Sequence, residues 1–258
     1  MPDIHHGADQ LGTSAWSVLY DGIEEPGVGL RVGLLRLGEA QTEVLTRAGR
    51  EVALVVLSGR GWIRCPDGEM SFDRHSWINE SPMVVHAAQG VRLELGAESA
   101  TEIAVVETSN ERHFATRLIA PSRVRVEQRG EGKLEGTAHR VVRTAFDGAD
   151  SPLAARLVIG EVVNRPGRWS SYPPHHHQQP EVYYYRFDRP QGYGHAECGD
   201  HVYKVREHDV LRIPGGMDHA QCAAPGYYMY YLWAIRHLDD AKYTGFEVSP
   251  AHQWTFVT

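Results

Sequence analysis

The chain has 258 residues, of which 42% are hydrophobic, enough for one or two globular domains with a packed core. Its formal net charge of -7 argues against a nucleic-acid partner, because phosphate binding needs a basic surface. The three cysteines are far apart and form no CxxC pair, so we expect no disulfide framework and a reducing, cytoplasmic setting. The longest apolar run, residues 52–57, is too short to cross a membrane, and the first residues lack the features of a signal peptide.

Strand signals dominate the chain. Short apolar or alternating segments recur between glycine, proline and aspartate turns, and no stretch of a dozen residues shows clear helical periodicity. In the first half the expected strands are 29–37, 51–57, 61–65, 91–95 and 102–107. In the second half they are 153–163, 181–187, 202–205, 210–214 and 227–235. Many short strands at close spacing predict an all-β protein made of barrels or sandwiches.

A dense group of candidate metal ligands lies in the second half. His175 and His177 are two residues apart, Glu181 follows four residues later, and His219 stands in a second turn, Pro-Gly-Gly-Met-Asp-His. Alternate side chains of a strand share a face, so His175 and His177 point the same way and His176 points the opposite way. Three imidazoles and one carboxylate can bind a divalent metal and leave coordination positions open.

The chain reads as two similar units, 1–120 and 151–258, joined by a polar, glycine-rich segment, 121–150, part of which can pair as a strand. Glu51-Val-Ala-Leu can be laid over Glu181-Val-Tyr-Tyr. This alignment places Leu45 and Arg47 where His175 and His177 stand, and Val91 where His219 stands. We therefore expect the first unit to lack metal ligands. Glu51 and His86 are the weak candidates for a remnant site there.

The HxHxxxE and PxGxxH motifs resemble the two metal motifs of the cupin barrels, and a degenerate unit before a competent one resembles a bicupin with two jelly-roll barrels. Segments 169–175, 181–187, 190–194, 224–232 and 250–254 resemble the 5-deoxy-glucuronate isomerases of inositol catabolism. Related isomerases act on 5-keto-4-deoxyuronate. The resemblance implies a metal-dependent aldose–ketose isomerase that converts 5-deoxy-glucuronate to 5-dehydro-2-deoxy-gluconate.

Such a reaction moves a proton between neighbouring carbons through an anionic enediolate, which a divalent Lewis acid stabilises. Zn²⁺ and Mn²⁺ suit this redox-neutral chemistry, and Fe also suits the ligand set. Tyr183 and Tyr185 share the face of Glu181 and are the candidate catalytic residues, with core packing as the other interpretation. The candidate cations for the substrate carboxylate are Arg212, Arg168 and Lys204.

Other functions stay open on the residues alone. The same ligands can hold Fe(II) for a cupin dioxygenase, and a barrel of this kind can bind a sugar acid without turnover. An isomerase of another deoxy-uronate, such as 5-keto-4-deoxyuronate, is a further alternative. The expected partner is a small molecule, with neither nucleic acid nor membrane, and barrels that pair through edge strands are compatible with a homo-oligomer.

Overall fold

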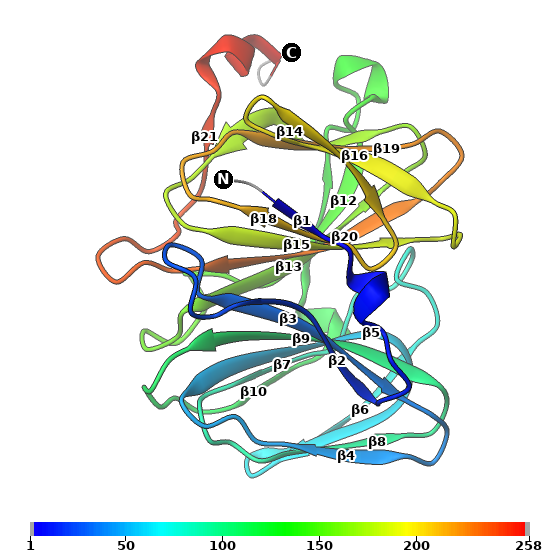
Figure 1. Ribbon diagram of the computed structural model, residues 1–258, viewed down its shortest axis with the longest axis vertical. Helices are drawn as coiled ribbons and strands as arrows, with labels where there is room; N and C mark the ends of the chain where they lie inside the picture. Colours follow the sequence, from blue (N-terminus) through cyan, green and yellow to red (C-terminus); the bar gives the residue numbers. More distant parts are fainter. Residues whose placement is uncertain (1–2, 256–258) are drawn as a thin grey trace.

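The computed structural model describes residues 3–255, and in this part of the chain the strands form three sheets. Figure 1 shows two barrels stacked along the long axis, the N-terminal one below and the C-terminal one above. The all-β prediction is confirmed. No helix within residues 3–255 has the length and apolar character needed to cross a membrane. The 3-10 helices are η1 (Gly7–Gln10), η2 (Pro121–Arg123), η3 (Leu134–Gly136) and η4 (Pro250–Thr255).

The N-terminal barrel is one curled sheet. Its long strand β5 (Arg50–Cys65) pairs with β7 and β9 along its first half and with β6 and β8 along its second half, so it takes part in both sides of the barrel. This strand covers segments 51–57 and 61–65, which the sequence predicts as two separate strands. The other strands are β2 (Trp16–Gly22), β3 (Leu30–Leu37), β4 (Thr42–Leu45), β6 (Gly68–Arg74), β7 (Val84–Ala87), β8 (Leu93–Ala97), β9 (Thr101–Ser109) and β10 (Arg117–Ile119).

The C-terminal barrel has two facing sheets. One has the order β1-β18-β15-β20-β13-β12-β11, and the other has the order β17-β16-β19-β14-β21. The first comprises β1 (Asp3–His5), β11 (Arg125–Arg129), β12 (Arg140–Phe146), β13 (Leu157–Asn164), β15 (Glu181–Phe187), β18 (Val210–Ile213) and β20 (Met229–Arg236). The second comprises β14 (Trp169–His176), β16 (Tyr193–Cys198), β17 (His201–Arg206), β19 (His219–Ala223) and β21 (Glu247–Val248).

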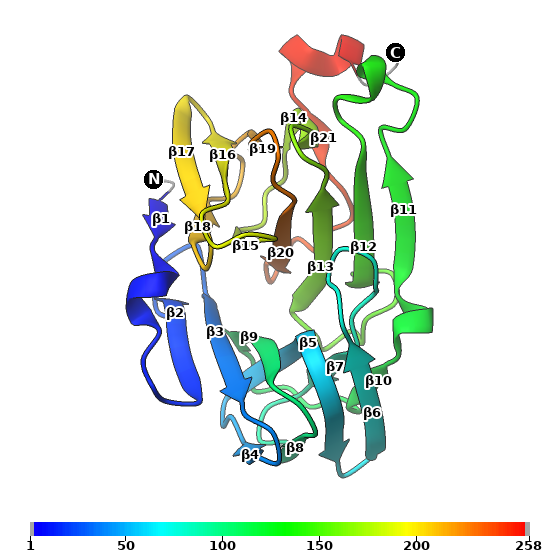
Figure 2. The ribbon, with the colours of Figure 1, turned by 90° about the vertical axis from the view of Figure 1, so that its right-hand side faces the viewer.

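Two segments lie in a different place from the one we expected. Residues 121–150 do more than connect the units, because β11 and β12 extend the seven-stranded sheet beyond β13. Figure 2 shows both strands on the flank of the upper barrel. Strand β1 pairs with β18, so the start of the chain completes the far edge of the C-terminal sheet. The C-terminal barrel therefore includes chain from outside the range predicted for it.

Strand alternation divides the buried apolar side chains into three cores. In the first part of β5, up to residue 56, even-numbered residues such as Val52 and Leu54 fill the N-terminal barrel, whereas the odd-numbered Ala53 and Val55 face the second barrel. The outer faces of β13, β15 and β20 meet that surface and form a continuous core between the barrels. Tyr183, Tyr185 and their neighbours point the other way, into the C-terminal barrel.

This division corrects the proposed alignment of Glu51 with Glu181. Glu51 lies on the same face of β5 as Ala53, in the interface between the barrels, whereas Glu181 points into the interior of the C-terminal barrel. Val52 takes the matching position. In the N-terminal barrel it lies between Glu107 of β9 and Ala87 of β7. In the C-terminal barrel Glu181 lies in the same way between Ile235 of β20 and Ile213 of β18. A one-residue slip in a strand moves every side chain to the other face.

Candidate metal centre

Two turns at one end of the C-terminal barrel bring the predicted ligands together. His175 lies near the end of β14, His177 directly follows that strand, and Glu181 begins β15. His219 begins β19 and pairs with His175 across the sheet. The amide of Gly216 donates to the carbonyl of His177 at 2.7 Å, and a Cβ at Gly215 would lie 2.0 Å from the carbonyl oxygen of Gln178. The glycine pair therefore lets the two ligand-bearing turns pack directly against each other.

Three of the predicted ligands form a compact cluster. Nε2 of His177 lies 3.1 Å from Oε2 of Glu181, and Nε2 of His219 lies 3.5 Å from the same oxygen. The candidate ligand atoms of these residues all lie within 4.8 Å of one another, and all three side chains are buried. Nε2 of His219 is buried without a hydrogen-bond partner. An orphaned buried nitrogen beside a carboxylate fits a bound cation.

His175 borders this cluster, with its ring centroid 4.6 Å from that of His219. Nδ1 of His175 donates to the carbonyl of Pro173 at 3.2 Å, and Nδ1 of His219 donates to the carbonyl of Met217 at 3.0 Å. A carbonyl only accepts, so in both neutral rings the lone pair stays on Nε2. Burial lowers the pKa of both histidines, and the neighbouring His219 lowers that of His175 further. Both rings are thus held in the neutral form that binds metals.

His176 turns away from the cluster, as strand alternation predicts. Its Nδ1 lies 2.7 Å from Oδ1 of Asp218, and the side chain is partly exposed.

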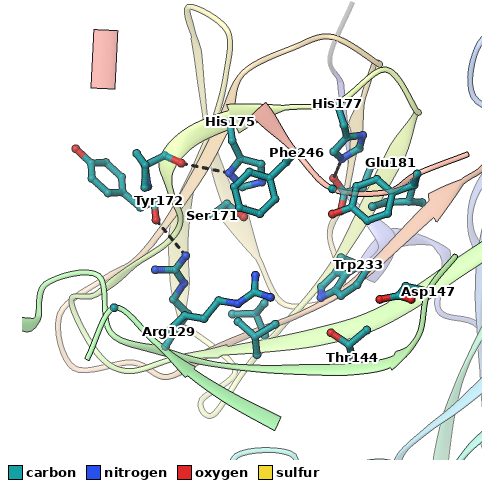
Figure 3. Close-up of a pocket in the computed structure, with 18 of the residues that line it drawn as sticks. Arg129, Thr144, Asp147, Ser171, Tyr172, His175, His177, Glu181, Trp233 and Phe246 are labelled. Atoms are coloured by element: carbon teal, nitrogen blue, oxygen red, sulfur yellow. Dashed lines mark hydrogen bonds and ion pairs between the residues drawn. The ribbon is translucent and has the colours of Figure 1, made fainter. Parts of the chain in front are cut away.

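His177 and Glu181 of the cluster, together with His175, line a cavity of about 700 Å³, a volume that suits a small-molecule ligand. Figure 3 shows His177 and Glu181 on one side, with the ring of Phe246 in front of His175. Tyr243 packs edge-on against His177 with ring centroids 5.0 Å apart. The C-terminal segment that carries these two aromatic residues therefore covers the cluster from outside.

The two candidate tyrosines lie at different depths. Tyr183 lines the cavity, and its hydroxyl is 3.2 Å from Oγ of Ser171, which also lies 3.2 Å from the hydroxyl of Tyr231. Tyr185 is fully buried below the cavity and donates to Oε1 of Gln221 at 2.6 Å. Burial raises the pKa of both tyrosines, and the charge of Glu181 adds to the effect on Tyr183. The structure places only Tyr183 of the pair at the cavity surface.

None of the three candidate cations lines the cavity. Arg212 pairs with Val182, so it lies on the outer face of its sheet, where it donates to Glu25 at 2.6 Å. Lys204 lies over the ring of Tyr193, 4.3 Å from its centroid, on the far sheet. Arg168 precedes β14 outside the cavity. The cations that do line it are Arg129, Lys133 and Arg140, from the segment expected to be a connection.

Among the residues that the structure describes, no such cluster lies at the matching end of the N-terminal barrel. Leu45, Arg47, Val52 and Val91 line a depression there that has no room for a water molecule. These are the counterparts anticipated from the sequence, with Val52 in place of Glu51. Three of these side chains are apolar, and Arg47 is paired with Glu107 at 2.7 Å, so none of the four offers a usual ligand atom.

Comparisons with known proteins agree with this architecture. A family model described as the KduI/IolB family matches residues 20–255. A curated 5-deoxy-glucuronate isomerase of Bacillus velezensis is 29% identical over 247 residues, which cover 88% of this chain and 87% of the relative.

Two solved structures show the same fold. The crystal structure of an IolB-like protein of Salmonella typhimurium superposes with a TM-score of 0.80 at 24% identity and covers 92% of this chain and 94% of its own. A cupin 2 conserved barrel protein of Leptotrichia buccalis superposes with a TM-score of 0.51 at 12% identity and covers 92% and 96% of the two chains. The pair of barrels is a bicupin.

Proposed function

Because this chain belongs to the KduI/IolB family, we propose that it is a metal-dependent isomerase that converts 5-deoxy-glucuronate to 5-dehydro-2-deoxy-gluconate. The observation that carries the proposal is the buried cluster of His177, Glu181 and His219, of which His177 and Glu181 line a substrate-sized cavity. The relatives favour an isomerase over a dioxygenase or a non-catalytic sugar-acid-binding protein.

We assign His177, Glu181 and His219 as ligands of a divalent ion and His175 as the fourth ligand. The two Nδ1–H···O=C bonds described above leave Nε2 of His175 and His219 ready to coordinate. Zn²⁺ and Mn²⁺ are the proposed ions, since both suit imidazole with carboxylate and the reaction needs no redox change. A bound divalent ion would supply Lewis-acid stabilisation of negative charge on a substrate oxygen.

The hydroxyls of Tyr183, Ser171 and Tyr231 form the polar group beside these ligands. Isomerisation of an aldose moves one proton from carbon to the neighbouring carbon and one proton between the two oxygens. A hydroxyl both donates and accepts, so this group can orient the substrate oxygens and carry the second proton. Tyr185 has no such role, because its hydroxyl is occupied by Gln221 away from the cavity.

The direct test is to load the purified protein separately with Zn, Mn, Fe, Co and Ni and to follow 5-deoxy-glucuronate by NMR. We expect conversion to the 2-deoxy-keto acid with at least one ion, under anaerobic conditions as well as in air. Absence of turnover with all five ions would overturn the isomerase proposal. A strict need for O₂ with iron would identify a dioxygenase instead.

A further inference from the structure

Two arginines face each other in the cavity wall. Arg129 of β11 and Arg140 of β12 are direct partners in an antiparallel pair, so their side chains leave the same face of the sheet. Both line the cavity that His177 and Glu181 also line. Figure 3 shows Arg129 across the cavity from Glu181.

Two facing guanidinium groups are unfavourable on their own, and in the described part of the chain only Arg129 has a carboxylate beside it, that of Glu127 at 2.5 Å. Like charges on directly opposed residues of a sheet repel each other, and burial together with the nearby charge of Arg129 lowers the pKa of Arg140. The guanidinium of Arg140 donates to the carbonyls of Ala138 and Tyr172 at 2.8 Å and 3.0 Å. Within residues 3–255 no carboxylate pairs with Arg140, although it is mostly buried.

Other buried arginines of this chain are neutralised. Arg74 and Arg143 lie 2.6 Å and 2.8 Å from the carboxylate of Glu161 in the interface between the barrels. Arg140 differs because the region in front of it is the cavity. A guanidinium has five N–H donors and two of these are used by carbonyls, so donors are left for a planar anion.

We infer that Arg140 and Arg129 together bind the carboxylate of an acidic substrate, in the cavity lined by the proposed metal ligands His177 and Glu181. The orientation of the bound substrate rests on the proposed function, since a deoxy-uronate has a carboxylate at one end and an aldehyde at the other. Binding the acid at the arginines directs the aldehyde end toward the histidines. Two-point binding of this kind selects uronates over neutral sugars.

The test compares an acidic with a neutral substrate. The ratio of kcat/KM for 5-deoxy-glucuronate to that for 5-deoxy-glucose should fall about tenfold to a hundredfold in Arg129→Gln and in Arg140→Gln, as expected for the loss of a charge-assisted hydrogen bond. Lys204→Gln removes a positive charge from the same barrel outside the cavity and should leave the ratio unchanged. Equal loss on both substrates would reduce the arginines to a structural role and overturn the inference.

Arg140 also supports the Tyr172 carbonyl, so its substitution can disturb β14. Within residues 3–255, Arg129 makes its side-chain hydrogen bonds only to exposed Glu127, and Arg129→Gln therefore tests the charge with little structural change. An unchanged ratio in this variant would remove Arg129 from the proposed pair.

Binding without turnover separates this inference from the isomerase proposal. Metal-free protein is titrated calorimetrically with gluconate, a polyhydroxy acid that lacks the aldehyde. Weakened binding in both arginine variants and unchanged binding in Lys204→Gln would support the carboxylate site even if no deoxy-uronate is isomerised. Equal gluconate affinity in all four proteins would overturn it, whatever the enzymatic activity.

Discussion

The carboxylate of Glu51 lies 2.7 Å from Nε2 of His86, and both side chains are completely buried. The same carboxylate accepts hydrogen bonds from the amides of Arg156 and Leu157, at 2.8 Å and 2.9 Å, and from Nδ2 of Asn110 at 2.7 Å. Burial alone would raise the pKa of Glu51, but the bond from His86 and the other donors hold it below its ordinary value. One N-terminal carboxylate thus binds the backbone that begins β13 of the other barrel.

We therefore expect Glu51→Ala to lower the free energy of unfolding by about 3 kcal/mol or more, because four buried donors lose their acceptor. Urea denaturation measures this change. Glu98→Ala, which removes one partner of an exposed pair with Arg60, should change it by less than about 0.5 kcal/mol. Metal content per folded molecule should stay at the wild-type value. Loss of metal from a folded Glu51→Ala protein would contradict the structural role.

The position of Glu51 also shows what the sequence could not determine. Strand existence follows from apolar and β-branched composition, and β15 has the predicted bounds. The face of each residue depends on the alignment between the two halves, and a match of two Glu-Val pairs gave a register one residue away from the one that the strand pairing supports.

The arginines that line the cavity also could not be identified from the sequence. Arg129 and Arg140 carry no motif, and they reach the cavity only because β11 and β12 extend the sheet past β13. The candidate metal ligands were easier to locate, because His175, His177 and Glu181 lie within a short segment and His219 stands in a second recognisable turn motif. Local spacing was therefore sufficient for the ligand cluster, whereas the opposite wall depends on long-range pairing.

Metal content should distinguish the ligand histidines His177 and His219 from His176. His177→Ala and His219→Ala should each lose most of the bound divalent ion, because each removes a member of the buried cluster. His176→Ala should keep it, since His176 bonds Asp218 on the other side of the strand. Elemental analysis after dialysis against trace metal gives the stoichiometry. Comparable loss in His176→Ala would mean that the ligand assignment is wrong.

Phe246 should affect turnover more than stability. Its ring lies 4.3 Å from that of His175 and is 37% exposed, so it covers the ligands while contributing little to a core. Phe246→Ala should admit water and lower kcat/KM by about tenfold, since electrostatic interactions weaken when water enters. The free energy of unfolding should change by less than about 1 kcal/mol.

Phe246→Leu keeps most of this cover and should retain most of the activity. Trp254→Ala removes an aromatic side chain that is 64% exposed and lies outside the cavity, and it should leave kcat/KM unchanged. If Phe246→Ala is as active as the wild-type protein, the segment does not shield the site.

His208 should make stability depend on pH. It lies in the left-handed backbone region at φ 67°, and its Nδ1 is 2.8 Å from the hydroxyl of Tyr184. Burial, with a further contribution from the charge of Arg186, lowers the pKa of His208 from 6.5 to about 4. Between these values the unfolded chain binds a proton that the native chain does not bind. Stability from this group is complete above the unfolded pKa and falls as the pH falls toward 4.

The size of this effect is limited to about 1.4 kcal/mol per pH unit, the value for a single proton. His208→Asn removes the titrating group, and asparagine tolerates the positive φ. Urea denaturation at pH 7.5, 6 and 5 should show wild-type stability falling more steeply than that of the variant, so that the difference between them narrows toward acid pH. Parallel curves over this range would mean that His208 titrates alike in the folded and unfolded chains.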